Sequence, residues 1–153
     1  MKLRKVLTGS AAFVGLLALT FINGPQASAS PQQCNTGKFC IWADLNYTGT
    51  LGQSQTSQGN LTNMDNKTTS FWNRTGKTVT VYNYANYVSS TKAGTGGKTS
   101  PYCVVVRPGA WYSNMNTVNP LYNDSVSSFE VGGTCTKSPV TYIFESKTGT
   151  PKN

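Results

Sequence analysis

A short pattern occurs twice in this chain, and it limits the fold more than any other feature. The first copy, Trp42–Gly49, has an aromatic residue, six residues that contain an Asn-Tyr pair, and a glycine. Forty residues later, Tyr82–Ser89 repeats the aromatic residue and the Asn-Tyr pair, with serine in place of the glycine. Repetition at a short period indicates one structural unit used twice, with the copies packed on each other.

A polar six-residue motif follows each copy. Residues 65–70 read Asp-Asn-Lys-Thr-Thr-Ser, and residues 123–128 read Asn-Asp-Ser-Val-Ser-Ser. These motifs are 58 residues apart rather than 40, so the second copy carries about 18 additional residues. The glycine-rich run 93–101 is the core of that insertion and is predicted to be an exposed loop.

The residues around these motifs have the patterns of β-strands. Thr78–Tyr82 alternates, which places Val79 and Val81 on one face. Cys103–Val106 is a β-branched run that stops at the turn formed by Pro108 and Gly109. A composition rich in Gly, Ser, Thr, Asn and Tyr also favours strands and turns over helices.

The N-terminus is predicted to be an export signal at residues 1–29. Lys2, Arg4 and Lys5 precede the apolar stretch Ala11–Ile22, and Ala27-Ser28-Ala29 reads as a cleavage site. About 12 apolar residues are too few for a bilayer core that needs roughly 20, so we expect secretion rather than a membrane anchor. The mature, extracellular protein is then expected to have one domain at 30–135 and a C-terminal tail at 136–153, with a further strand at Val140–Phe144.

Four cysteines, all beyond the signal, indicate an oxidising compartment and two disulfides. Three pairings are possible. The favoured pairing joins Cys34 to Cys40 across a short loop and leaves Cys103 for Cys135. The chain has no histidine and no CxxC pair, which argues against a metal site at the cysteines.

The net charge of the mature chain is moderately positive. Loss of the signal removes three of the 13 basic residues and leaves 10 against five acidic residues, a net of +5. The basic residues are scattered singly along the chain, which is typical of a solvated surface. An exported protein without a clustered basic stripe is not expected to bind nucleic acid, although weak attraction to acidic cell-wall polymers or anionic surfaces stays open.

The aromatic-x6-Gly hairpin followed by (Asn/Asp)-(Asn/Asp)-x-x-(Ser/Thr)-Ser resembles the βγ-crystallin Greek-key signature, over roughly residues 34–131. The resemblance implies an all-β, βγ-crystallin-like double Greek-key sandwich, here stapled by disulfides. The opening Cys34–Cys40 and the late Val106–Ala110 segment are further similar to a secreted actinobacterial peptidase-inhibitor family, typified by the Streptomyces metalloproteinase inhibitor.

Most enzyme classes lack their essential residues in this chain. Without histidine there is no Ser-His-Asp or Cys-His nucleophile. A glycosidase needs two positioned carboxylates, and two of the five available, Asp65 and Asp124, already belong to the repeated motif. We therefore expect a non-enzyme.

Peptidase inhibition is the predicted function. The resemblance implies a reactive bond between a disulfide-bonded cysteine and a valine, and Cys103-Val104 is the only such step in the chain. With Tyr102 it forms the predicted inhibitory segment, directed at an extracellular peptidase, and in this family a metallopeptidase. The alternative is that Cys103-Val104 begins a buried strand. We expect a monomer without nucleic-acid or membrane partners.

Two other functions stay open. No cofactor is required, but the resemblance implies paired Ca²⁺ sites, whose ligands would be the side chains of Asn66 and Asp124, the hydroxyls of Thr69 and Ser127, and the carbonyls of Lys67 and Ser125. Alternatively, these residues only close turns through hydrogen bonds. A carbohydrate- or cell-wall-binding protein of the antimicrobial type is the other candidate, with a platform of Trp42, Trp72, Trp111 and the eight tyrosines in which Trp111-Tyr112 is the foremost pair, although such aromatic residues more often lie in the core.

Overall fold

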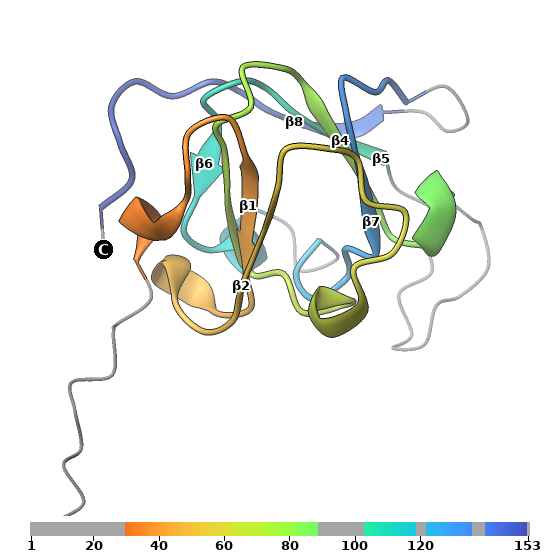
Figure 1. Ribbon diagram of the computed structural model, residues 1–153, viewed down its shortest axis with the longest axis horizontal. Coiled ribbons are helices and arrows are strands. Elements are labelled where there is room, and N and C mark those ends of the chain that lie inside the picture. The colour runs from red at the N-terminus through yellow and green to blue at the C-terminus, as the bar shows by residue number, and fades with distance from the viewer. Residues whose placement is uncertain (1–29, 89–102, 119–121, 136–139, 153) are drawn as a thin grey trace, which may run out of the picture.

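The computed structural model describes residues 30–88, 103–118, 122–135 and 140–152 (Figure 1). The predicted export signal and the glycine-rich run 93–101 lie outside the described residues. The described strands are β1 (Phe39–Trp42), β2 (Leu51–Ser54), β3 (Ser70–Asn73), β4 (Val79–Tyr82), β5 (Cys103–Val106), β6 (Trp111–Tyr112), β7 (Ser128–Val131) and β8 (Val140–Phe144). Short 3₁₀ turns connect them: η1 (Pro31–Gln33), η2 (Leu45–Tyr47), η3 (Thr62–Met64), η4 (Ala85–Tyr87) and η5 (Met115–Thr117).

The strands form two four-stranded sheets, ordered β2-β1-β3-β6 and β7-β4-β5-β8. All neighbours are antiparallel except β5 and β8. Each copy of the repeat also contributes to the other copy's sheet: β6 of the second copy pairs with β3, and Gln58 of the first copy bridges to Phe129 in β7. This reciprocal crossing is a double Greek key and confirms the predicted fold class.

The main core lies between the two sheets. Alternation along β1 directs Phe39 and Ile41 into this space, where the Phe39 ring packs edge-on against Phe129 of the second sheet at 4.9 Å between centroids. Val79 and Val81 enter from β4 on the face that the sequence predicts. Burying each such side chain contributes about 1.5–3 kcal/mol, so this contact holds the two copies together.

A smaller core covers the outer face of the first sheet. Cys40 and Trp42 of β1 and Trp72 of β3 point away from the main core, and the disulfide between Cys34 and Cys40 packs with the two tryptophans. The whole of β1 is therefore buried on both faces. The second disulfide joins Cys103 to Cys135, so both favoured cysteine pairs are formed.

The tail is part of the second sheet. Its predicted strand is β8, which runs parallel to β5, and Arg107 N donates to Phe144 O at 2.9 Å. The Phe144 ring is fully buried and packs edge-on against Phe71 at 4.8 Å. Residues beyond Cys135 thus complete the core rather than trail from it.

We expect Phe144→Ala to lower the free energy of unfolding by about 3–5 kcal/mol, because it removes a buried ring from the core. Urea denaturation of the mature protein measures this change. The neighbouring Ile143→Ala is the control, since Ile143 is 39% exposed and should change stability by less than about 1 kcal/mol. Equal effects of the two substitutions would show that the tail is not packed as described.

Candidate functional site

The two hairpin motifs are closed by the same side chain in the same way. The last serine of each polar motif bonds to the hairpin of its own copy. Ser70 Oγ accepts from Tyr47 N at 3.1 Å and donates to Asp44 O at 2.7 Å. In the second copy, Tyr87 N donates to Ser128 Oγ at 3.1 Å, and Ser128 Oγ donates to Tyr84 O at 2.6 Å. The final serine of the motif is therefore structural.

The first hairpin loop, residues 44–48, is held on both sides. Asn46 N donates to Ser113 O at 2.7 Å, which ties the loop to the second copy. The amide and hydroxyl of Thr48 both donate to Leu45 O, at 3.3 and 2.8 Å. Tyr47 is fully buried beneath the loop, and this burial raises the pKa of its phenol. Hydrogen bonds therefore fix the backbone of this exposed loop against the rest of the molecule.

Leu45 lies at the top of this loop with 48% of its surface exposed. Ala85 occupies the equivalent position of the second hairpin. Large exposed apolar side chains are few among the described residues: Leu45, Val88 and Ile143. Leu45 is not among the residues predicted from the sequence to form a site, although an aliphatic residue inside the polar turn of a hairpin is a signal that could have indicated it.

The two polar motifs lie in equivalent, interlocked corners. Asn66 N donates to Val126 O, and Asp124 N donates to Thr68 O, each at 3.0 Å. Asn66 and Asp124 both have left-handed backbones, with φ of 53° and 50°, a conformation that Asn and Asp tolerate best after glycine. Each motif thus donates one equivalent backbone hydrogen bond to the other, so the two corners are related by approximate two-fold symmetry.

The predicted calcium ligands come together in two pairs. Thr69 Oγ1 donates to Asp124 Oδ1 at 3.1 Å. At the other corner, Asn66 and Ser127 line a cavity of about 250 Å³ that also contains Asp65, a carboxylate missing from the predicted set. Lys67 is exposed and Ser125 is buried, beside these pairs in the chain. Within the described ranges, no group of three or more His, Cys, Asp or Glu side chains could hold a metal, so any cation here would have mostly neutral oxygen ligands.

The predicted inhibitory segment lies in a different setting. Cys103 and Val104 have no exposed surface, and β5 lies between β4 and β8. Both residues pair with β4, and β8 covers the other edge with an irregular register between Cys103 and Val104. A peptidase cannot reach a peptide bond whose residues have no exposed surface. The described part of the segment is thus a buried strand, and Tyr102 lies outside the described residues.

The predicted aromatic platform is largely covered. Trp42 is fully buried and Trp72 is 8% exposed, with the Arg74 guanidinium 4.5 Å from the centre of its ring. The Lys147 ammonium lies over Trp111 and Tyr112, at 4.3 and 3.5 Å from the ring centres. A cation therefore lies over one face of Trp72, Trp111 and Tyr112, where a sugar ring would otherwise stack.

This arrangement of two interlocked Greek keys defines a βγ-crystallin-like domain. The structure titled "Evolution of the eye lens beta-gamma-crystallin domain fold" has a TM-score of 0.50 and 11% identity, and the alignment covers 65% of this chain and 88% of that one. Two further similar structures are a βγ-crystallin from an archaeon (TM-score 0.47, 21% identity, 63% and 99% coverage) and one from Ciona intestinalis (0.48, 18%, 62% and 99%).

Residues 27–93 match the family model described as peptidase inhibitor family I36. This match confirms the resemblance to peptidase inhibitors that the repeat and the opening cysteines indicate. It contains the first hairpin loop and ends before β5. No curated protein sequence matches the chain. Among the described residues, no helix is long and apolar enough to span a membrane.

We expect Ser70→Ala to lower the free energy of unfolding by about 1–3 kcal/mol, because Tyr47 N and Asp44 O would lose their buried partner. Ser128→Ala should have a similar effect through Tyr87 N. Amide hydrogen exchange of each variant identifies the loosened hairpin. Each variant should speed exchange only in the hairpin that its serine closes, and faster exchange in both hairpins of one variant would contradict this assignment.

Proposed function

We propose that the chain is a secreted inhibitor of an extracellular peptidase and that the hairpin loop 44–48 makes the inhibitory contact. The supporting observation is that the region similar to peptidase inhibitors, residues 27–93, contains this loop and excludes the buried Cys103-Val104 step. The loop thus replaces that step as the proposed site. The two disulfides and the predicted export signal agree with an extracellular location.

The loop has the physical properties that a peptidase contact requires. It is exposed, it carries an apolar side chain, and hydrogen bonds at Asp44, Asn46 and Thr48 fix its backbone. A rigid loop loses little conformational entropy on binding, which raises affinity. If the loop were cut, the same bonds would hold the new ends in place, which favours resealing over release.

Leu45 is the proposed anchor in the specificity pocket. Asp44, which precedes it, has an extended backbone with φ −116° and ψ 168°, and the 3₁₀ turn η2 begins at Leu45. An aliphatic residue directly after the scissile bond suits the metallopeptidases that the family resemblance names. We therefore place the substrate-like bond between Asp44 and Leu45 and propose a metallopeptidase target.

Purified mature protein is expected to inhibit at least one peptidase in a panel of thermolysin-like metallopeptidases and subtilisin-like serine peptidases. Leu45→Asp should weaken inhibition about 30-fold, since loss of a central apolar anchor costs roughly 2 kcal/mol or more. Val88→Asp is the control, because Val88 is 41% exposed in the second hairpin and should leave the inhibition constant unchanged. Full potency of Leu45→Asp would place the contact elsewhere, and no inhibition across the panel would contradict the function itself.

Calcium binding at the polar corners is a second candidate function. The contact between Thr69 Oγ1 and Asp124 Oδ1, together with the cavity that joins Asp65, Asn66 and Ser127, supports it. Calcium prefers carboxylate, amide, hydroxyl and carbonyl oxygens, and these donor types are present at both corners. An ion here would brace the two copies against each other.

If calcium binds with a dissociation constant near 1 mM, about 10 mM Ca²⁺ should raise the melting temperature by roughly 4 °C or more. Asp124→Asn should remove half of this shift. Asp44→Asn is the control and should leave the shift intact, because the Asp44 carboxylate is at the same end of the molecule but outside the two polar motifs. Differential scanning fluorimetry after chelator dialysis measures the shift. The same melting temperature with and without Ca²⁺ would contradict calcium binding.

A further inference from the structure

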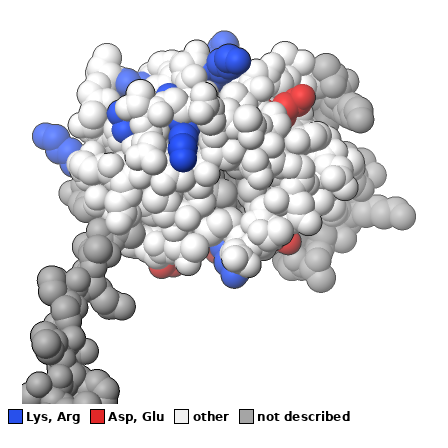
Figure 2. Space-filling view, in the orientation of Figure 1, with Lys and Arg blue, Asp and Glu red and all other residues white. Residues whose placement is uncertain are grey.

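Five basic residues from four separate segments of the sequence lie at one end of the molecule. Lys38 precedes β1, Arg74 follows β3, Lys77 precedes β4, Arg107 follows β5, and Lys147 lies over the start of β6. The strand register brings these positions together, because Phe39 pairs with Asn73 and Val79 pairs with Val106. We call this set the basic end (Figure 2). The hairpin loops follow the opposite ends of β1 and β4.

Few carboxylates oppose these charges. Asp44, Asp65 and Asp124 are at the hairpin end, and Glu130 Oε2 accepts from Tyr82 OH on the second sheet. Glu130 is nevertheless near the basic end, because it pairs with Thr80 and its carboxylate lies against Gly133, a lining residue of the groove that contains Lys77 and Arg107. At the same end, Glu145 Oε2 lies 3.8 Å from Arg107 Nε. Both side chains are largely exposed, so this ion pair is weak. Among the described residues, the basic end therefore has five basic side chains and two acidic ones.

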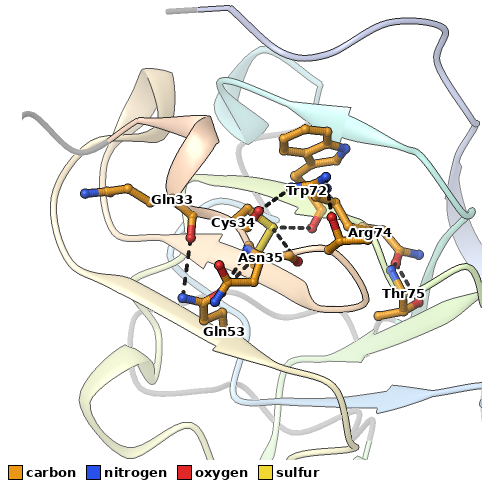
Figure 3. The surroundings of a disulfide bond; sticks show 10 residues. Gln33, Cys34, Asn35, Gln53, Trp72, Arg74 and Thr75 are labelled. Atoms are coloured by element: carbon orange, nitrogen blue, oxygen red, sulfur yellow. Dashed lines mark hydrogen bonds between the residues drawn. A yellow bond between two sulfur atoms is a disulfide. The ribbon is translucent and has the colours of Figure 1, made fainter.

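The first cleft of the basic end contains two cations in fixed positions. Arg74 and Lys147 line a cleft of about 300 Å³, whose walls include three glycines. The Arg74 guanidinium donates to Cys34 O (Figure 3). It also donates to Thr36 Oγ1 at 2.7 Å. Burial lowers the pKa of the Lys147 ammonium, and an anion placed beside it would counter that effect.

A second groove of about 610 Å³ carries another pair of cations, Lys77 and Arg107. The buried side chain of Asn73 holds the backbone between the two grooves, since its Nδ2 donates to Lys77 O at 2.8 Å and to Arg107 O at 3.1 Å. Two separate cation pairs on one rigid surface match a ligand with repeated anionic groups rather than a single small anion.

Among the described residues, the basic end has one large exposed apolar side chain, Ile143, which is 39% exposed and lines the Lys77–Arg107 groove. Arg74 and Lys147 cover its tryptophans. Of the exposed apolar residues in the described ranges, Leu45 and Val88 are in the hairpins at the opposite end. Because the cleft and the groove carry four cations and Ile143 alone of the exposed large apolar residues, a polyanion fits this surface better than a folded protein, whose binding usually needs a cluster of apolar anchors.

We propose that the basic end binds a linear anionic polymer with phosphate or carboxylate groups in its repeat. Successive anionic groups enter the Arg74–Lys147 cleft and the Lys77–Arg107 groove. The hairpin loops face away from this surface, so a polymer-bound molecule still presents Leu45. This proposal is independent of the inhibitory function.

Isothermal titration calorimetry of the mature protein at low salt tests the proposal with poly(glycerol phosphate), poly(galacturonic acid) and neutral dextran. We expect binding of at least one polyanion, no binding of dextran, and an affinity that falls steeply with added salt. The two polyanions distinguish phosphate from carboxylate as the recognised group. Lys77→Glu should weaken binding about fivefold, and Lys147→Gln should also weaken it.

Lys67→Glu is the matched control, because Lys67 is an exposed lysine of the hairpin end and the change in net charge is the same as in Lys77→Glu. It should reduce affinity less than twofold. An equal loss in Lys67→Glu would show that net charge alone attracts the polymer. Absence of polyanion binding, or binding of dextran at equal affinity, would also overturn the proposal. Loss of peptidase inhibition in Lys77→Glu without polymer binding would assign the basic end to a protein partner instead.

Discussion

The burial of each repeat against its twin supports everything else in this molecule. A single copy has one apolar sheet face and cannot cover it, so Phe39 and Ile41 of the first copy need Phe129 and Val81 of the second. The polar corners secure the same contact from outside the core through reciprocal bonds from Asn66 N and Asp124 N. Because the two contacts act on the same pair of sheets, each restricts the movement that would break the other.

This arrangement separates the surface into two ends with different chemistry. The hairpins and polar corners, with Leu45, Asp65 and Asp124, follow one set of strand ends. The basic end gathers at the opposite ends of the same strands. Each end is held by a buried polar side chain, Ser70 or Ser128 at the hairpins and Asn73 at the basic end. Neither surface therefore depends on a flexible loop for its shape.

Much of the fold could be predicted from local patterns. The structure has strands at Val79–Tyr82, Cys103–Val106 and Val140–Phe144, where the sequence has β-branched or alternating runs. These could be predicted because successive side chains of a strand point to opposite faces, so burial of one face shows in the order of adjacent residues. The two corners could be predicted because Asn and Asp accept the left-handed backbone that the turn requires. The Cys34–Cys40 disulfide could be predicted because the two cysteines are only six residues apart.

The functional surfaces were harder to predict. A valine after a disulfide-bonded cysteine is compatible with an inhibitory bond and equally with a β-strand. Val104 is buried partly by β8, which comes about 40 residues later in the chain. The sequence does not show that Leu45 is exposed. Its exposure follows from the loop conformation, in which Tyr47 is buried and Asn46 N bonds to Ser113 O. Asp65 joins Ser127 only across the interface between the two copies.

The linear order of residues thus specifies the repeat, its strands, its turns and the absence of histidine chemistry, since all of these depend on residue type and short-range spacing. It does not specify which side chains share a surface. The positive charges illustrate the difference: Lys38, Arg74 and Arg107 are more than 30 residues apart, and antiparallel register alone brings them to one end. Exposure and charge clustering depend on contacts between distant segments, so they arise only when the two sheets pack.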